Sequence, residues 1–355
     1  MKVLVNQLKE GCILSKDVNS LSSKSLFPSK TVVTKQTIEI LNAFLIHAVE
    51  VEGFLVNGVA FLPETKNENN NSELDSISFY EMYLKVVNEY KQLFMNWQAG
   101  IQVEIGKVRE LIIPLLEKAL LEPSEIMNLH QFSTKSDYLY HHSVAVGIIA
   151  AYLGKKLQYD QGDCNQLALA GLLSDCGMSK IDRKILYKKG PLNSSEFNEI
   201  KKHPVLSYKM IEKISLLKDS VKLAVFQHHE RVDGSGYVLG ISGEKLHPFG
   251  KVVAISDVYH AMCCDTNYRI KRAPLVVLEE VAQGSFGKFD MQLVQVLIQE
   301  VARLTIGTVV KLSNGQIGKV IFVDDKYPTR PMVEVNDSLI QLSNRKELYI
   351  EQIIG

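Results

Sequence analysis

Alternating apolar positions near the N-terminus predict a small mixed unit. The segments MKVLVNQL and SKTVVT are rich in β-branched residues and are separated by turn residues, which is typical of short strands. From Thr34 to Phe44 the apolar residues recur at helical spacing, and residues 48–56 return to alternation. We therefore expect a small α/β or β-rich domain over residues 1–61. The Asn-rich, apolar-poor stretch 62–76 is predicted to be a polar linker.

Helical periodicity dominates from residue 77 onwards. Apolar residues recur three and four positions apart over residues 77–121, and Pro114 marks a break or a kink. This helical connector is expected to pack on the next domain. If its apolar stripe were exposed instead, it would be a surface for a homodimer. Residues 122–303 then show one helical pattern after another.

Polar residues mark several helix boundaries within residues 122–303. Ser136 is the expected N-cap of the helix that carries His142, and Asn193 opens a capping box. The helix that begins there is expected to end near His203, because a proline follows directly. Residues 252–262 fit either a strand or a helix, and their helical surroundings favour a helix.

The pattern changes again from residue 304. The run TVVKLSNGQIGKVIFVDD alternates around an Asn-Gly pair, which is a strong signal for a β-hairpin. Strand-like segments follow at residues 332–335 and 348–354. We expect residues 304–355 to form a small β-barrel-like domain. The predicted fold is therefore multidomain, with a central all-α domain flanked by the N-terminal α/β unit and this β domain.

Length and composition exclude some classes of protein. The 355 residues are too many for one compact core, and 40 basic residues balance 40 acidic residues, so nothing suggests a nucleic-acid polymer or an anionic membrane as partner. The longest apolar run, residues 144–153, is shorter than the about 20 residues of a membrane span. The N-terminus lacks the apolar core of a signal peptide, and the five cysteines show no metal-binding or disulfide spacing. We expect a cytoplasmic protein.

Two adjacent histidines precede a glycine-rich loop in the segment FQHHERVDGSGYVLG. His228 and His229 stand directly before Asp-Gly and Ser-Gly turn signals, at a place where imidazoles often bind metal. A polar helix end with two solvated histidines would have the same sequence. Eight of the nine histidines, however, lie between His130 and His260, which favours a metal site.

Five ionisable residues fall on the inward apolar stripes of consecutive predicted helices. They are His142, Asp175, His203, His228 and Asp257. Burial of an imidazole or a carboxylate is costly unless the group is paired or metal-bound. Any one of the five alone would indicate a hydrogen-bonded core residue, but together they predict a metal centre. Mixed His/Asp ligands suit Fe, Mn or Zn, and two neighbouring ions can clamp a phosphoryl group during hydrolysis.

The motifs together resemble those of the HD-GYP family of cyclic di-GMP phosphodiesterases. They are HSxxV at His142, the Ser174-Asp175 doublet, HP at His203, HHExxDGSGY from His228 and SDVYHAM around Asp257. The resemblance covers roughly residues 124–301. It implies an all-helical HD-type fold, a di- or trinuclear Fe or Mn site, and cleavage of cyclic di-GMP to linear pGpG or GMP.

The resemblance also implies roles for single residues. The implied metal ligands are His142, Asp175, His203, His228, His229 and Asp257. Asp175 would be the bridging carboxylate and the catalytic group. The implied substrate-binding residues are Gly236, Tyr237, Arg269 and Lys271, with Arg272 as an alternative to Lys271. The loop that holds Gly236 and Tyr237 is also the expected surface for protein partners.

The sequence departs from the family pattern beside Asp175. Ser174 stands where the family has the histidine of its HD doublet, and a serine hydroxyl is a poor ligand for a divalent ion. Met178 replaces a lysine and cannot donate a proton. Both changes predict a weakened metal site and reduced hydrolysis.

Three further departures affect the metal count and the loop. Tyr138 occupies a position that is acidic in trinuclear members, so a third ion is not expected. Val238 stands where the loop usually has a proline, and His260 replaces an aspartate. His260 or His141 could supply the missing imidazole.

Three hypotheses follow for the function. The chain is a phosphodiesterase with an impaired mono- or dinuclear centre, a non-catalytic module that binds cyclic di-GMP or a protein, or a protein that has left nucleotide use. The retained ligand positions argue against the third hypothesis, and the losses at Ser174 and Met178 argue against full activity. We expect a cyclic di-GMP signalling protein with impaired or absent hydrolysis.

Overall fold

The computed structural model describes residues 2–354 with interruptions. The residues left undescribed are 1, 6–7, 20–24, 44–45, 47, 59–60, 62–77, 267–268, 285–286 and 355. The chain divides into two compact units, Met1–Ser76 and Ile77–Gly355. The expected polar linker lies outside the described residues, and the finer division into five segments stays a prediction. None of the described helices combines the length and the apolar character that a membrane crossing needs.

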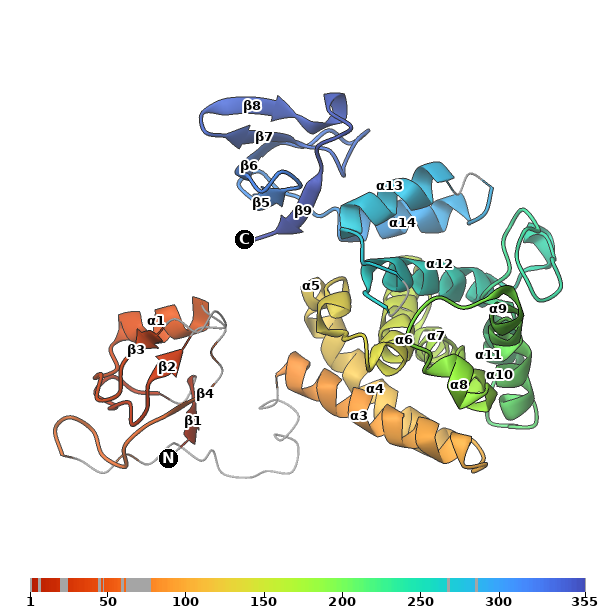
Figure 1. Ribbon diagram of the computed structural model, residues 1–355, viewed down its shortest axis with the longest axis horizontal. Coiled ribbons are helices and arrows are strands. Elements are labelled where there is room, and N and C mark those ends of the chain that lie inside the picture. Colours follow the sequence, from red (N-terminus) through yellow and green to blue (C-terminus); the bar gives the residue numbers. More distant parts are fainter. Residues whose placement is uncertain are drawn as a thin grey trace. The chain divides into compact units, whose positions relative to one another are not determined.

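The first unit is a small α/β arrangement, as expected. Its elements are β1 (Lys2–Leu4), β2 (Val18–Asn19), β3 (Ser25–Phe27), α1 (Lys35–Ala43) and β4 (Ala48–Glu50) (Figure 1). Strand β1 pairs antiparallel with β4, and β2 pairs with β3. The strand predicted for SKTVVT is reduced to a single bridge at Val32, which follows a turn where Lys30 has a positive φ of 67°.

Two long helices begin the second unit. They are α3 (Phe79–Gln98), which starts with a capping box between Ser78 and Glu81, and α4 (Ile105–Leu121). Their apolar stripes belong to the same core as the helices that follow, so the connector packs on the next domain as predicted. Of the break or kink expected at Pro114, the break is absent, since α4 continues through this residue to Leu121.

Helices α6 (Tyr138–Lys156) and α7 (Gln161–Leu173) form the centre of the second unit. Helix α6 is buried around most of its circumference, which positions His141, His142 and Ser143 inside the protein. The predicted N-cap at Ser136 was wrong. The N-cap position is Asp137, and the Ser136 hydroxyl pairs with that of Thr134 at 3.1 Å, so it is unable to cap the helix.

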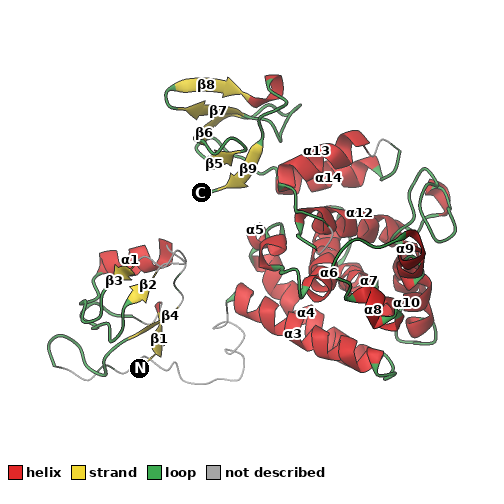
Figure 2. Ribbon diagram, viewed as in Figure 1, coloured by secondary structure: helices red, strands yellow, loops and turns green. Residues whose placement is uncertain are grey.

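Further helices surround this pair (Figures 1 and 2). They are α5 (Pro123–Ile126), α8 (Arg183–Leu186), α9 (Ser194–Ile200), α10 (His203–Ile211), α11 (Asp219–Gln227), α12 (Pro248–Cys263), α13 (Pro274–Gly284) and α14 (Met291–Val301), with 3-10 turns at Leu129–Phe132, Cys176–Lys180 and Gly243–Lys245. The capping box at Asn193 and the helical assignment of residues 252–262 are both confirmed.

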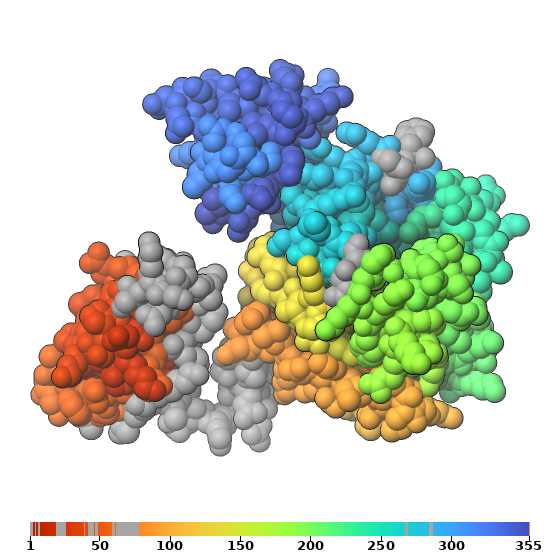
Figure 3. All heavy atoms as spheres, viewed as in Figure 1, coloured from red at the N-terminus to blue at the C-terminus, as the bar shows by residue number. Residues whose placement is uncertain are grey.

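The C-terminal segment is an antiparallel sheet, and its atoms are drawn in blue in Figure 3. Its strands are β5 (Val309–Leu312), β6 (Ile317–Phe322), β7 (Met332–Val335), β8 (Ser338–Gln341) and β9 (Ile350–Ile353), in the order β8-β7-β6-β5-β9, with a 3-10 turn at Leu342–Asn344. The predicted Asn-Gly hairpin joins β5 to β6, with Gly315 at φ 85°. Strand β8 was missed, since its two-residue turn uses Asn336 and Asp337, both with positive φ, rather than glycine.

Candidate metal centre

Six residues that lie far apart in the sequence converge between helices α6, α7, α10, α11 and α12. Their possible ligand atoms form two groups. One group comes from Asp175, His203, His228 and His229, and the other from His142, Asp175 and Asp257. Within each group the atoms lie within 4.8 Å of one another. Asp175, which follows the end of α7, belongs to both groups. The structure therefore brings together all six of the ligands that the sequence predicted.

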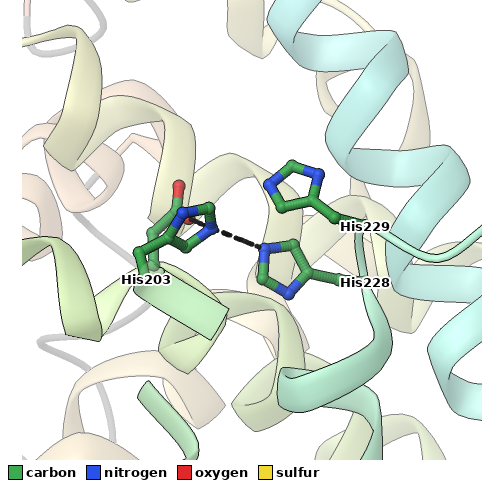
Figure 4. A group of neighbouring side chains, drawn as sticks. His203, His228 and His229 are labelled. Carbon is green, nitrogen blue, oxygen red and sulfur yellow. Dashed lines mark hydrogen bonds and ion pairs between the residues drawn. The ribbon is translucent and has the colours of Figure 1, made fainter. Parts of the chain in front are cut away.

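The first group, which we call the four-donor group, comprises three imidazoles and one carboxylate. The Nε2 atoms of His203 and His228 lie 3.0 Å apart (Figure 4). Asp175 Oδ1 lies 3.1 Å from His203 Nε2 and 3.7 Å from His228 Nε2. The ring of His229 completes the group, with its centroid 4.2 Å from that of His228. These donors surround one point from several directions.

Backbone carbonyls fix the orientation of two of these rings. His203 Nδ1 lies 2.7 Å from the carbonyl oxygen of Ile200, and His228 Nδ1 lies 2.7 Å from that of Val225. Each Nδ1–H therefore donates to a carbonyl, and each Nε2 is left with a lone pair. Two such lone pairs 3.0 Å apart repel each other unless a cation lies between them. Metal-binding histidines are oriented in this way by the hydrogen bond of their other nitrogen.

The second group, which we call the three-donor group, contains two carboxylates and one imidazole. His142 Nε2 lies 2.9 Å from Asp257 Oδ1 and 3.6 Å from Asp175 Oδ2. Asp257 Oδ2 also lies 3.9 Å from His229 Nδ1, which connects this group to the four-donor group. The two groups thus form one continuous cluster of donors with Asp175 between them.

Burial and charge set the ionisation of the cluster. Burial alone would raise the pKa of Asp175, but the neighbouring imidazoles of His203 and His228 hold it well below its ordinary value. Burial would lower the pKa of His142, but the hydrogen bond to Asp257 and the two carboxylate charges raise it. Burial and the neighbouring His228 lower the pKa of His229 well below 6.5. The carboxylates are therefore anionic, as metal ligands must be.

Ser174 contributes no donor to either group. Its hydroxyl donates to the carbonyl of Gly171 at 2.8 Å, one turn back along α7. Its own carbonyl accepts a hydrogen bond from the Ser207 hydroxyl at 2.6 Å. Ser174 therefore ends α7 and joins the segment to α10 instead of facing an ion. Met178 packs against the apolar core.

Two other histidines lie near the cluster but outside both groups. His260 Nδ1 faces His142 Nδ1 at 3.0 Å, on the side of the His142 ring that points away from Asp257. His141 Nδ1 instead lies 3.3 Å from the hydroxyl of Tyr83. Neither residue is among the grouped donors, so neither takes the place of the imidazole absent at Ser174.

The loop after His229 is held against the four-donor group. The ring of Tyr237 stacks on that of His229, with centroids 4.7 Å apart, and the Tyr237 amide donates to the His229 carbonyl at 3.1 Å. Gly236 has no room for a side chain, since a Cβ there would lie 2.4 Å from the Cα of Glu230. The loop can approach the donors this closely only because residue 236 is glycine.

Glu230 holds this loop in place, and its role was missed by the sequence analysis. Its side chain is buried, and Oε1 accepts hydrogen bonds from the amides of Leu239 at 2.6 Å and Gly240 at 3.2 Å. The only sequence signal was an acidic residue directly after two histidines, and that pattern does not indicate a contact nine residues ahead.

The predicted phosphate-binding residues lie beyond the C-terminal end of α12. The guanidinium of Arg269 donates to the carbonyl of Ala261 in the last turn of that helix. Its charge is close enough to the cluster to lower the pKa of His142. Lys271 and Arg272 are exposed, and Arg272 pairs with Glu280. Arg269 is therefore the predicted phosphate-binding residue whose charge acts on a donor of the cluster, His142.

The chain is similar to known proteins that contain an HD domain or cleave cyclic dinucleotides. A family model described as "HD domain" matches residues 123–293. Cyclic di-GMP phosphodiesterase PA4108 of Pseudomonas aeruginosa is 27% identical over 243 residues, which are 68% of this chain and 58% of that protein. Cyclic di-GMP phosphodiesterase PdeB of Borreliella burgdorferi is 28% identical over 55% of this chain and 52% of its own. The 3'3'-cGAMP-specific phosphodiesterase 1 of Vibrio cholerae is 30% identical over 46% of this chain and 38% of that protein.

A solved structure shows the same fold. Bd1817, an HDG"Y"P protein from Bdellovibrio bacteriovorus, superimposes with a TM-score of 0.52 at 13% identity, over 84% of this chain and 97% of its own. The fold and the donor cluster define a helical domain built around a His/Asp centre. Residues 123–293 match the HD domain, and the chain is similar to proteins named as cyclic di-GMP phosphodiesterases. It spans about half the length of the curated relatives it matches.

Proposed function

We propose that this protein is a cyclic di-GMP signalling protein of the HD-GYP phosphodiesterase class, with a metal-dependent centre whose hydrolytic activity is impaired. The observation that carries the proposal is the pair of donor groups that share Asp175. Relatives named as phosphodiesterases of cyclic di-GMP and of 3'3'-cGAMP support a cyclic dinucleotide as the ligand. Cyclic di-GMP is the first candidate.

The residues present fit a divalent transition metal such as Fe or Mn. His203, His228, His229 and Asp175 would hold one ion, because two of their Nε2 lone pairs already converge. His142 and Asp257 would hold a second ion together with Asp175 as the bridge. Bound ions of this kind supply Lewis-acid activation of a phosphate oxygen and a nucleophile derived from water. Asp175, which is buried and anionic, would hold the two ions at a fixed separation.

The proposed impairment follows from what surrounds Asp175. The three-donor group has one ligand fewer than the four-donor group, and the Ser174 hydroxyl is engaged by Gly171. Met178 carries no proton that it could donate to a leaving oxygen. We therefore expect about one tightly held ion per chain, in the four-donor group, and slow or absent hydrolysis.

The remaining substrate contacts are part of the same proposal. Tyr237 and Gly236 would form one wall of the ligand site, because they lie against His229. Arg269 would contact a phosphate, with Lys271 or Arg272 assisting. The same loop exposes Leu239, which is 64% accessible and offers an apolar contact to a protein partner. Such a partner, and a homodimer, stay predictions.

The alternative function is a non-catalytic module that binds a cyclic dinucleotide or a protein. The same two observations favour it, namely the missing donor at Ser174 and the uncharged Met178. A cyclic dinucleotide would bind at the metal centre in both cases. They differ only in whether the phosphodiester is cleaved.

Turnover and metal content test the proposal together. The full chain would be purified anaerobically and incubated with cyclic di-GMP and Mn²⁺ or Fe²⁺, and products would be separated by chromatography. Formation of linear pGpG or GMP supports the enzyme, and binding in calorimetry without product supports the module. Tight binding of two ions per chain would contradict the expected weakness of the three-donor group. Absence of both metal and ligand binding would overturn the proposal.

A further inference from the structure

The four-donor group opens to solvent on the side of His229. The side-chain exposure is 0% for His228, 1% for His203 and 6% for Asp175, whereas it is 17% for His229. The ring of Tyr237 stacks on this more exposed imidazole at an interplanar angle of 21°. The donor of this group that is most exposed to solvent therefore lies directly beside Tyr237.

Lys201 places a positive charge at this edge. Its Nζ lies 5.0 Å from the centroid of the Tyr237 ring and 5.4 Å from that of Phe197. Cations are attracted to aromatic faces at such distances. The ammonium group is thus held in contact with the residue that covers His229, although Lys201 belongs to a different part of the chain.

The backbone fixes this position further. Lys201 follows the last residue of α9 and lies two residues before His203, which begins α10. Its amide donates to the carbonyl of Phe197 at 3.0 Å, and the side chain is half-buried. The backbone hydrogen bond and the contacts with two aromatic rings restrict the positions that this side chain can take.

No carboxylate neutralises this ammonium group among the described residues. The neighbouring lysines differ, because Lys188 pairs with Glu196 and Lys202 pairs with Glu199, each at 2.6 Å. An aromatic face attracts a cation but does not cancel its charge. The charge of Lys201 therefore remains available to an anion, in a setting where burial reduces screening by water.

We propose that Lys201 binds a phosphate group of the cyclic dinucleotide at the entrance to the metal centre. This inference rests on the proposed function, because it requires a phosphodiester ligand. Lys201 would also compensate for the absence of a positive charge at Met178. Met178, on the 3-10 turn that follows Asp175, carries no charge, so an additional cation for the phosphates has to come from another element. Lys201 supplies it from the link between α9 and α10.

Calorimetry on the metal-loaded full chain tests the inference. The dissociation constant for cyclic di-GMP would be measured for the wild-type protein and for K201Q, K201R and K202Q at two salt concentrations. We expect K201Q to bind about tenfold more weakly and to show a smaller salt dependence, because one charge-assisted contact is lost. K201R keeps the charge and should stay within about threefold of the wild type. K202Q removes an exposed, paired lysine next to it and should bind normally.

Two results would overturn the inference. One is equal affinity of K201Q and the wild type, and the other is an equal loss in K201Q and K201R, which would mean that Lys201 only packs. Metal content and the unfolding midpoint of each variant show whether the centre is intact, and K201M, which keeps the aliphatic stem, replaces K201Q if that variant is unstable. If the wild-type protein holds metal but binds neither cyclic di-GMP nor 3'3'-cGAMP, that result would instead overturn the proposed function itself.

Discussion

Gly147 of α6 and Gly171 of α7 lie in direct contact, because a Cβ added to Gly171 would be only 2.7 Å from the Cα of Gly147. The two helices approach so closely that no side chain fits between them. Helix α6 carries His142, and Asp175 follows the end of α7. This glycine contact therefore sets the separation between two of the six donors.

Replacing Gly171 by alanine should separate these helices. We expect G171A to lower the free energy of unfolding by about 1–3 kcal/mol, which is typical of overpacking, and to reduce metal retention. Denaturant unfolding and metal analysis after dialysis measure the two effects. G106A is the matched control, since Gly106 has open space around its Cβ position on α4 and should be neutral or stabilising. Unchanged stability in G171A would show that the helices adjust freely.

The residues beside Asp175 provide a gain-of-function prediction. We expect the double variant S174H/M178K to bind a second metal ion and to cleave cyclic di-GMP faster than the wild type. The imidazole would add a donor to the three-donor group, and the ammonium group would supply a proton donor. Each single variant is a control, and S174A should behave like the wild type in metal content. An unchanged rate with two bound ions would place the deficit outside these two positions.

The sequence was sufficient to predict which six side chains converge, because their chemistry conflicts with their surroundings. Imidazoles and carboxylates such as His142 and Asp257 occur on stripes that are otherwise apolar, and burial of such groups requires partners. Helix periodicity placed them on inward faces, and the order of the motifs matched a family. These features are local in the sequence, so they could be found without coordinates.

Other features depend on contacts between distant segments and could not be predicted. The carboxylate of Glu230 accepts hydrogen bonds from a loop nine residues ahead, and the Gly147–Gly171 contact joins two helices. The misplaced cap at Ser136 has a similar cause. Its hydroxyl can reach either a helix amide or the Thr134 hydroxyl, and only the folded turn decides between them. Propensity alone does not resolve such a choice.

The pair formed by His142 and Asp257 predicts a pH-dependent stability of the metal-free protein. The pKa of His142 is raised above 6.5, so its contribution is present below that value and is lost as the pH rises through the folded-state pKa. The pKa of Asp257 is held below 3.8, so its contribution is present above that value and is lost as the pH falls. The pair should therefore stabilise the fold most between about pH 4 and 6.5.

A comparison with D257N measures this effect. Urea unfolding of both proteins in the presence of a chelator, from pH 3 to pH 9, should give the largest difference in stability within that window and smaller differences on either side. H141N is a control, because His141 contacts Tyr83 and not Asp257. The difference in stability between H141N and the wild type should not peak between about pH 4 and 6.5. A difference between D257N and the wild type that does not vary with pH would contradict the proposed coupling.

The C-terminal sheet should depend on one ion pair with α13. Arg330 donates to both carboxylate oxygens of Glu279, at 2.8 and 2.7 Å, and also to the backbone carbonyls of Leu342, Arg345 and Leu348. The two side chains are only 16% and 17% exposed. Removal of one partner leaves a poorly solvated charge, so we expect E279Q to destabilise the docked sheet by about 3 kcal/mol.

Hydrogen exchange over residues 309–353 would detect this loosening before global unfolding. E351Q is the matched control, because the pair of Lys311 with Glu351 on the same sheet is 41% and 49% exposed and should contribute little. Helix α13 packs on α12, which carries Asp257, so metal retention in E279Q also tests whether the sheet influences the centre. Faster exchange in the sheet with unchanged metal retention would show that the sheet is held by Arg330 and is independent of the donors. Unchanged exchange would show that apolar packing alone holds the sheet on α13.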